Sequence, residues 1–189
     1  MTDDEFQRLL SRAGDGDQDA FGDLWQAHNP PLVRVLRAMA GPEHAEDLAS
    51  TVWVDVLRSL DGFRGTEDGF RGWLFTIARR RLIDLRRREA RRPQVAMDDV
   101  AERAGDAPDP ATSATDRDAT DGALALIATL PPDQAEVVLL RVVAGLDVAQ
   151  VAAIVGRRPG TVRVMAHRGL RRLAEELGAR SDVPGGGAV

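Results

Sequence analysis

A proline-containing acidic stretch divides the chain into two blocks. Residues 94–121 hold eight acidic residues against two arginines, and Pro108 and Pro110 stand among them. The few apolar residues of this stretch follow neither a helical nor a strand period. Proline, glycine, serine and aspartate at this density predict an extended or flexible segment. The sequence therefore predicts two small domains joined by a flexible acidic linker at residues 93–121.

Both blocks have the pattern of helices, because apolar residues recur every three or four positions rather than alternately. In the first block, helices are predicted over 19–28, 32–40, 42–60 and 68–90, with Asn29-Pro30-Pro31 ending the first. In the second block they are predicted over 123–130, 134–144, 148–155 and 159–177. The predicted fold is all-α, with domains at 1–92 and 122–178 and a disordered glycine-rich tail at 179–189.

The helix expected at residues 68–90 carries two kinds of surface. At about 100° per residue, its leucines and Phe70 share one face, whereas Trp73, Arg80 and Arg87 line up on another. A tryptophan at the head of an arginine stripe suits base stacking beside a phosphate track. The alternative is that Trp73 belongs to the core and the arginines face solvent. Arg81 falls on the apolar side, which predicts a buried carboxylate partner.

Residues 147–177 have the pattern of a helix-turn-helix. Asp147 and Gln150 are spaced as a capping box before a short helix, Gly156 suits the turn, and Pro159 opens a second helix. The residues expected to face inward on that second helix are Val162, Met165, Ala166, Gly169, Leu170 and Leu173. Those expected to face outward are Arg163, Val164, His167, Arg168 and Arg171. Arginine can bond guanine or phosphate and valine can contact a thymine methyl, so this face fits a DNA major groove. A plain helical hairpin is the alternative.

The charge distribution supports two separate anion contacts. All 25 basic residues are arginine, and the net charge is −5. Residues 63–93 nevertheless carry a net charge of +6 and residues 157–180 a net charge of +5. Arginine donates two hydrogen bonds from one planar fork, which suits phosphate and base edges. Two basic segments in an acidic protein therefore point to nucleic acid, with solvated helix faces as the alternative.

Composition excludes several classes of function. The chain has no cysteine and no tyrosine, so it has no disulfide, thiolate metal site, cysteine nucleophile or tyrosine base. Its histidines, His28, His44 and His167, lack metal-ligand spacing. We therefore expect no catalytic residues, no metal, no cofactor and no small-molecule substrate. With neither a signal-peptide pattern nor an apolar run of membrane-spanning length, we expect a soluble cytoplasmic protein without membrane insertion.

Together the two blocks resemble the extracytoplasmic-function (ECF) RNA polymerase sigma factors of the sigma-70 family. In the first block the resemblance rests on Ala45-Glu-Asp-Leu48, Val52-Trp53, Phe63-Arg-Gly65 and the run from Phe70 to Arg79, which resemble the σ2 domain. In the second it rests on Leu130-Pro-Pro-Asp-Gln134, Val138-Leu-Leu-Arg141, Gly145-Leu146 and the run from Gly160 to Arg168, which resemble σ4. The order and spacing of these pieces make the resemblance specific.

The resemblance implies a promoter-specific initiation factor and assigns roles to three sets of residues. Core polymerase would be bound through its β′ clamp by Glu46, Asp47, Leu48, Thr51, Val52 and Trp53. The −10 element would be read and melted by Phe63, Arg64, Phe70, Arg71, Trp73, Arg79, Arg80, Arg86 and Arg87. The −35 element would be read by Arg157, Arg158, Thr161, Arg163, Val164, His167, Arg168 and Arg171. The implied partners are core RNA polymerase, including its β flap, promoter DNA and an anti-sigma factor.

Two other functions share part of this pattern. An ordinary helix-turn-helix regulator with an N-terminal sensor block would share the second block, but residues 1–92 show neither a ligand pocket nor an alternating α/β pattern. A metal-dependent nuclease could use Glu46 and Asp47, but adjacent helical residues diverge, whereas such a site needs converging carboxylates.

Overall fold

The computed structural model describes residues 2–91 and 122–181, all of whose regular elements are helical. We call these two ranges the first and second domains. The predicted linker at 93–121 and the tail beyond Ser181 lie outside the described residues. The first domain comprises α1 (Asp3–Gly14), α2 (Gln18–Ala40), α3 (Pro42–Ser59), the 3-10 turn η1 (Leu60–Gly62) and α4 (Glu67–Arg91). None of the described helices is long and apolar enough to cross a membrane.

The pattern predictions missed the first helix, α1. Thr2 caps it, its hydroxyl accepting from the backbone N–H of Glu5 while the Glu5 carboxylate accepts from the backbone N–H of Thr2. Phe6, Leu10 and Ala13 are buried at the spacing of one helical face. The signal was therefore present in the sequence, as a capping box followed by an apolar stripe.

The prediction that Asn29-Pro30-Pro31 ends a helix is wrong, because α2 runs unbroken from Gln18 to Ala40 with both prolines inside it. Leu24, His28 and Leu32 form one buried row through the prolines. The Asn29 side chain also accepts a hydrogen bond of 3.0 Å from the Trp53 indole of α3. Packing against α1, α3 and α4 therefore outweighs the backbone hydrogen bonds that the prolines remove.

The second domain comprises a helix at residues 122–128, α6 (Pro132–Val138), the π-helical turn η2 (Leu139–Val143), α7 (Val148–Val155) and α8 (Pro159–Ser181). The helix predicted at 134–144 thus exists but finishes as a π turn. The predicted tail is wrong for its first residues, since α8 continues to Ser181. Val137, Val138, Leu139 and Leu146 lie at the centre of this domain's core, together with Val151 and Val162.

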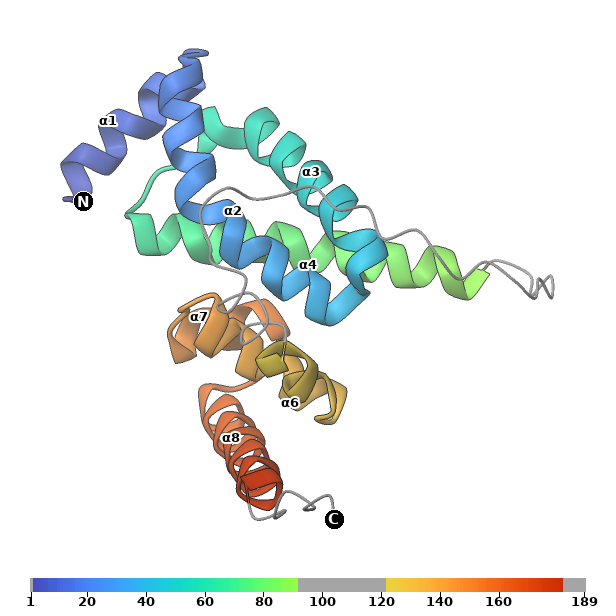
Figure 1. Ribbon diagram of the computed structural model, residues 1–189. Helices are drawn as coiled ribbons and strands as arrows, with labels where there is room; N and C mark the ends of the chain where they lie inside the picture. The colour runs from blue at the N-terminus through green and yellow to red at the C-terminus, as the bar shows by residue number, and fades with distance from the viewer. Residues whose placement is uncertain (1, 92–121, 182–189) are drawn as a thin grey trace, which may run out of the picture.

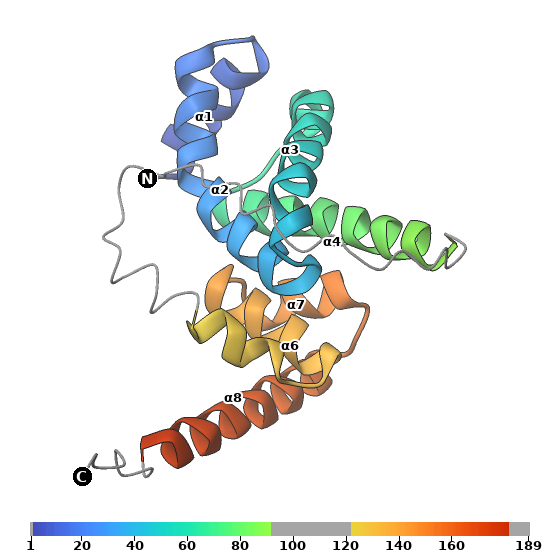
Figure 2. The same ribbon diagram turned by 45° about the vertical axis from the view of Figure 1, so that its right-hand side comes forward.

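The two domains lie against each other. Figures 1 and 2 show α6 and α7 below α2 and α4, with α8 on the far side of the second domain and its C-terminal half extending away. Most contacts between the domains join α4 to α7 and α2 to η2.

Candidate polymerase and promoter interfaces

A helix-turn-helix forms at the predicted place. The Asp147 carboxylate accepts from the backbone N–H of Gln150 at 2.8 Å, and the Gln150 amide oxygen accepts from the backbone N–H of Asp147 at 2.9 Å. Gly156 ends α7 in the left-handed conformation, with φ +67° and ψ +38°, which a glycine adopts without steric cost. The predicted capping box and glycine turn are thereby confirmed.

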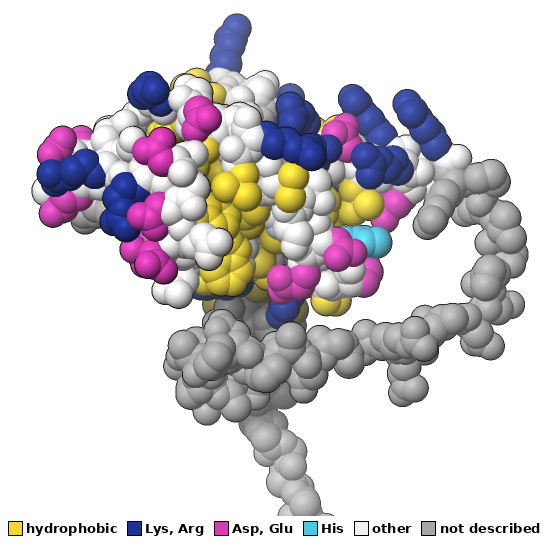
Figure 3. All heavy atoms as spheres, turned by 90° about the horizontal axis from the view of Figure 1, so that it is seen from above, with side chains coloured by type: hydrophobic (Ala, Val, Ile, Leu, Met, Phe, Trp, Pro, Cys, Tyr) yellow, Lys and Arg dark blue, Asp and Glu magenta, His cyan; other side chains and the backbone are white. Residues whose placement is uncertain are grey.

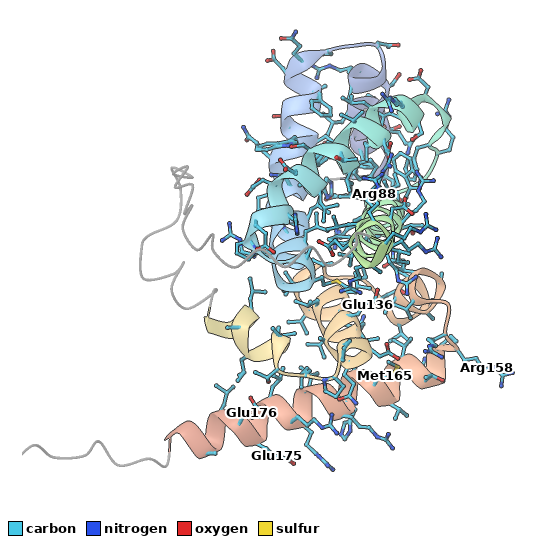
Figure 4. The ribbon with its side chains drawn as sticks, turned by 90° about the vertical axis from the view of Figure 1, so that its right-hand side faces the viewer. Arg88, Glu136, Arg158, Met165, Glu175 and Glu176 are labelled. Atoms are coloured by element: carbon cyan, nitrogen blue, oxygen red, sulfur yellow. The ribbon has the colours of Figure 1, made fainter. Side chains whose placement is uncertain are left out.

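The inner face of α8 packs closely on α6. Val162 and Leu173 are buried, and a Cβ placed on Gly169 would lie 2.7 Å from the Val138 side chain. Figure 4 shows Met165 on the side of α8 that faces the rest of this domain. The prediction that Leu170 faces inward is wrong, because 47% of this residue is exposed. Its position at the edge of the apolar stripe, about 80° from the line of Val162, accounts for this.

All eight residues predicted to read the −35 element are exposed, six of them on α8 and the other two, Arg157 and Arg158, in the turn before it. Arg158, Arg163 and Arg168 make no ion pair or hydrogen bond with the residues that the structure describes. Arg158 projects away from the body of the protein in Figure 4. Arg157 pairs weakly with Asp133 at 3.3 Å, and Arg171 with Glu175 at 3.2 Å on the exposed surface. This face therefore offers several arginines to an anionic partner at little desolvation cost.

The structure divides the six residues predicted to bind polymerase. Glu46, Asp47 and Thr51 lie on the outward face of α3, whereas Leu48, Val52 and Trp53 are buried in the first domain. Direct contact with a partner is open only to the exposed three. The buried three support the helix, as when Trp53 packs edge-on against Phe21 with ring centres 5.6 Å apart.

Sequence reasoning missed two apolar residues on the same outward face. Val54 and Leu57 are 44% and 47% exposed, at helical spacing from Asp47 and Thr51. On the neighbouring α2, Trp25 is also 41% exposed. Figure 3 shows the first domain from the side opposite the second domain, with apolar side chains forming a band between charged ones. The sequence does contain a signal for these two residues, because Val54 and Leu57 continue the helical face of Asp47 and Thr51 at steps of three or four positions.

An aromatic cluster lies where α4 begins. Phe63 precedes the helix and stacks on Trp73, with ring centres 5.0 Å apart and planes inclined by 29°. Phe70 is fully buried beneath both rings, with its centre 5.6 Å from that of Phe63. The aromatic surface predicted for base stacking therefore consists of the half-buried Phe63 and Trp73, and Phe70 supports it from below. A cavity of about 380 Å³ lies beside it, lined by Phe63, Arg64 and residues of α1.

The arginines of α4 have different partners. Arg81 donates two hydrogen bonds, of 2.6 and 2.5 Å, to the mostly buried carboxylate of Asp55 on α3. The carboxylate partner predicted for Arg81 is thus confirmed, and this guanidinium lowers the pKa of Asp55 below its ordinary value. Arg86 donates to the Met39 carbonyl at 3.0 Å, and Arg79 to Glu136 of the second domain at 2.7 Å.

Two further arginines of the predicted −10 set, Arg80 and Arg87, have weak ion pairs or none with the described residues. Arg80 lies 3.5 Å from the Asp55 carboxylate and is well exposed. Arg87 is exposed and makes no ion pair or hydrogen bond with the described residues. At the start of the helix, Arg71 pairs with Asp68 at 3.1 Å, and Arg64 donates to the carbonyls of Asp61 and Phe63. The open part of the α4 stripe is therefore Trp73, Arg80 and Arg87.

His28 is the buried titratable group of this region. Its ring lies 5.1 Å from that of Phe70, and its Nε2 has no hydrogen-bond partner. Burial lowers the pKa of His28, although Glu67, whose carboxylate is 4.0 Å away, opposes this in part. The neutral ring therefore belongs to the core. Within residues 2–91 and 122–181, no three His, Asp or Glu side chains converge as a metal site.

Comparison with known proteins matches both domains. The family model "Sigma-70 region 2" matches residues 24–92, and "Sigma-70, region 4" matches residues 121–173. The chain is 37% identical over 186 residues to "ECF RNA polymerase sigma factor ShbA" of Streptomyces griseus, covering 92% of this chain and 97% of that protein. It is 30% identical over 187 residues to "ECF RNA polymerase sigma factor SigD" of Mycobacterium tuberculosis, covering 96% and 88%.

Two solved structures have a similar fold. One is CnrH in complex with the cytosolic domain of CnrY, with a TM-score of 0.62 and 24% identity, covering 90% of this chain and 96% of that one. The other is the sigma factor RpoE in complex with the anti-sigma factor NepR from Bartonella quintana, with a TM-score of 0.62 and 25% identity. That likeness covers 84% of this chain and 96% of the other.

Proposed function

Because the chain belongs to the ECF RNA polymerase sigma factors of the sigma-70 family, we propose specific roles for its exposed surfaces in transcription initiation. A sigma factor binds core bacterial RNA polymerase and directs it to promoters. The observation that carries this function is the match of both domains, in order, to the two sigma-70 regions. The region 2 match over residues 24–92 also removes the alternative of an N-terminal sensor block.

The second domain reads the −35 element in this proposal. The outer face of α8 enters the major groove with Arg163, Val164, His167 and Arg168, all exposed. Arg158 and Arg157 lie at the entry of the helix, where they contact phosphates. Free guanidinium groups around one apolar contact supply both base discrimination and backbone attraction.

The first domain reads and melts the −10 element. The stacked pair Phe63 and Trp73 supplies an aromatic surface at the head of the stripe that continues with Arg80 and Arg87. Stacking of an unpaired base on such a surface is worth about 1 to 3 kcal/mol, comparable with the cost of unpairing it. Four further arginines flank this track and exchange their partners within the protein for DNA phosphates on binding: Arg64, Arg71, Arg79 and Arg86.

Core polymerase binds the outward face of α3. Glu46, Asp47 and Thr51 supply its polar part, and the exposed Val54 and Leu57 continue it as an apolar part. An interface whose apolar centre is bordered by charges is typical of stable protein partners. The β flap of the polymerase is the proposed partner of the second domain.

The relatives of this chain support two further proposals, on its regulation and on its location. RpoE of Bartonella quintana was solved in complex with an anti-sigma factor, and we propose that an anti-sigma factor also holds this chain inactive. We place the chain in the cytoplasm with its polymerase, acting without catalysing a reaction of its own.

Co-elution with core RNA polymerase in gel filtration tests the proposed function. We expect stoichiometric binding of the wild-type chain and at least tenfold weaker binding of Asp47→Arg. Asp23→Arg makes the same change of charge at an exposed position on α2, away from the outward face of α3, and should bind normally. Absence of wild-type binding would overturn the function. Equal binding by both variants would overturn the assignment of the α3 face.

A further inference from the structure

The loop that leads into α4 is held in its middle by another helix. Residues 63–66 join η1 to α4, and all four are exposed or half-buried. The side-chain amide of Gln7, on α1, donates a hydrogen bond to the Gly65 carbonyl at the centre of this loop. Figure 1 shows the segment that enters α4 passing close to the first half of α1. The hydrogen bond therefore ties the loop to a helix 58 residues away along the chain.

The two ends of the same loop are fixed by local hydrogen bonds. The backbone N–H of Phe63 donates to the Leu60 carbonyl at 3.0 Å. The Thr66 hydroxyl accepts from a backbone N–H in the first turn of α4 at 3.1 Å. Neither of these two bonds reaches the central peptide of the loop. The bond from Gln7 therefore orients the Gly65 carbonyl, which the local bonds leave free to turn.

The backbone at Gly65 also limits where the Phe63 ring can lie. A Cβ placed on Gly65 would lie 3.2 Å from the tip of that ring, so the ring packs directly on the glycine. The same ring stacks on Trp73, with centres 5.0 Å apart. Closely packed groups transmit a displacement to one another. A turn of the Gly65 peptide would therefore move Phe63 and change the aromatic surface that it forms with Trp73.

The helix α1 also supports this aromatic surface from beneath. Phe6 is fully buried and meets Phe70 edge-on, with ring centres 5.7 Å apart. Phe70 in turn lies 5.7 Å from Trp73, measured between ring centres. The sigma-70 region 2 match begins at residue 24, so it assigns no role to α1. Because Phe6 and Gln7 are neighbours and point about 100° apart, one helix reaches both the core below the aromatic surface and the loop at its side.

We propose that Gln7 is a positioning residue for promoter reading, whose hydrogen bond to the Gly65 carbonyl holds Phe63 in place to stack an unpaired −10 base. Gln7 acts through Phe63 and does not itself read the base. A loop that is ordered before binding does not have to be ordered by the DNA, which improves affinity. Without the bond, one base is read less well, while the arginines still hold the phosphates. The inference rests on the proposed function, because it assumes that Phe63 and Trp73 stack a base.

Selection of single strands by the holoenzyme tests this role. Gln7→Met removes the hydrogen-bond donor and keeps a side chain of similar length. The matched control is Gln26→Met, the same substitution at an exposed position on α2. Each chain is assembled with core RNA polymerase and used to enrich DNA from a pool of single strands with a random central segment. Sequencing then gives the base preference at each position. We expect Gln7→Met to lose about fivefold of the preference at one position, with its neighbours and the control unchanged.

Two results of this selection would overturn the positioning role and leave the proposed function intact. One is a Gln7→Met chain whose preferences equal those of the wild type at every position. The other is an equal weakening at all positions, which would assign Gln7 only to the stability of the first domain. A wild-type holoenzyme that enriches no sequence would instead count against the proposed function, and the inference would fail with it.

A double-variant comparison tests whether Gln7 acts through Phe63. The strand that the wild type enriches is labelled, and fluorescence anisotropy measures its binding to each holoenzyme. Phe63→Ala should weaken binding about tenfold, because it removes one ring of the aromatic surface. Gln7→Met should weaken it about threefold. Together the two should weaken binding no more than Phe63→Ala alone, since the hydrogen bond then has no ring to position. Losses that multiply would show independent action and overturn the positioning role.

Discussion

The arginines of α4 and those of α8 differ in what holds them. On α8, Arg163 and Arg168 make no ion pair with the described acids, and neither does Arg158 in the turn before the helix. On α4, Arg81 is clamped by Asp55, and Arg79 by Glu136. Similar densities of one residue type thus serve two purposes: the α8 arginines are available to a partner, whereas several α4 arginines are part of the fold. Net positive charge in a segment therefore does not by itself identify a nucleic-acid surface.

The largest expected effect tests the structural role of the α4 arginines. Asp55→Ala leaves the Arg81 guanidinium partly buried and without its carboxylate. We expect the free energy of unfolding to fall by about 3 kcal/mol. Asp47→Ala, an exposed acid on the same helix, should cost less than about 0.5 kcal/mol. Urea unfolding followed by circular dichroism measures both free energies. Similar losses for the two variants would show that the Arg81–Asp55 pair does not stabilise the fold, and would remove the distinction between the arginines of α4 and those of α8.

The next effect concerns the α8 arginines, for which we expect a loss of DNA binding without a loss of stability. Arg168→Ala should weaken binding to a duplex carrying the −35 element by about 1 to 3 kcal/mol, with the free energy of unfolding nearly unchanged. Anisotropy titrations of the polymerase-bound chain at two salt concentrations measure the loss. Arg172→Ala is the matched control, because that arginine bonds to Gln134 of α6 at 3.1 Å. Equal weakening by the control would mean that α8 acts only through its total charge.

A smaller effect concerns pH and the core beneath α4. Burial lowers the pKa of His28 in the folded protein below its value in the unfolded chain. The unfolded state therefore binds the proton more tightly, and stability declines as pH falls through about 6.5, the ordinary histidine value. We expect the urea midpoint of the wild type to be lower at pH 5.5 than at pH 7.5. His28→Gln should reduce this difference, and an unchanged difference would show that other groups cause it.

The smallest effect separates Arg80 from its neighbour Arg81. Arg80 lies 3.5 Å from Asp55 and is exposed, so Arg80→Ala should change the free energy of unfolding by less than about 0.5 kcal/mol. Binding of a single-stranded oligonucleotide should nevertheless weaken, with the salt dependence reduced by about one phosphate contact. Unfolding and anisotropy experiments on one preparation compare the two quantities. A clear loss of stability would assign Arg80 to the fold together with Arg81.

Much of the fold and part of the site were predictable from the sequence. The α7 boundaries, the Asp147 capping box, the Gly156 turn and the outward face of α8 were all predicted correctly. The errors occurred where packing opposes a local rule. Pro30 and Pro31 are breakers by themselves, yet α2 continues through them because its buried row packs on three other helices. Leu48 and Val52 were assigned to an interface because a motif carries no information on which of its residues face inward.

The sequence by itself determined most of the helices, the helix-turn-helix and the exposed face of α8, because caps, turns and amphipathic periods act over a few residues. Only the tertiary structure decided which arginines remain available. Their partners lie far along the chain, 26 residues from Arg81 to Asp55 and 57 from Arg79 to Glu136. No local pattern encodes such a pairing, since it depends on how α3 and α6 are brought against α4. The same packing brings the second domain onto α4, the helix that we propose reads the −10 element.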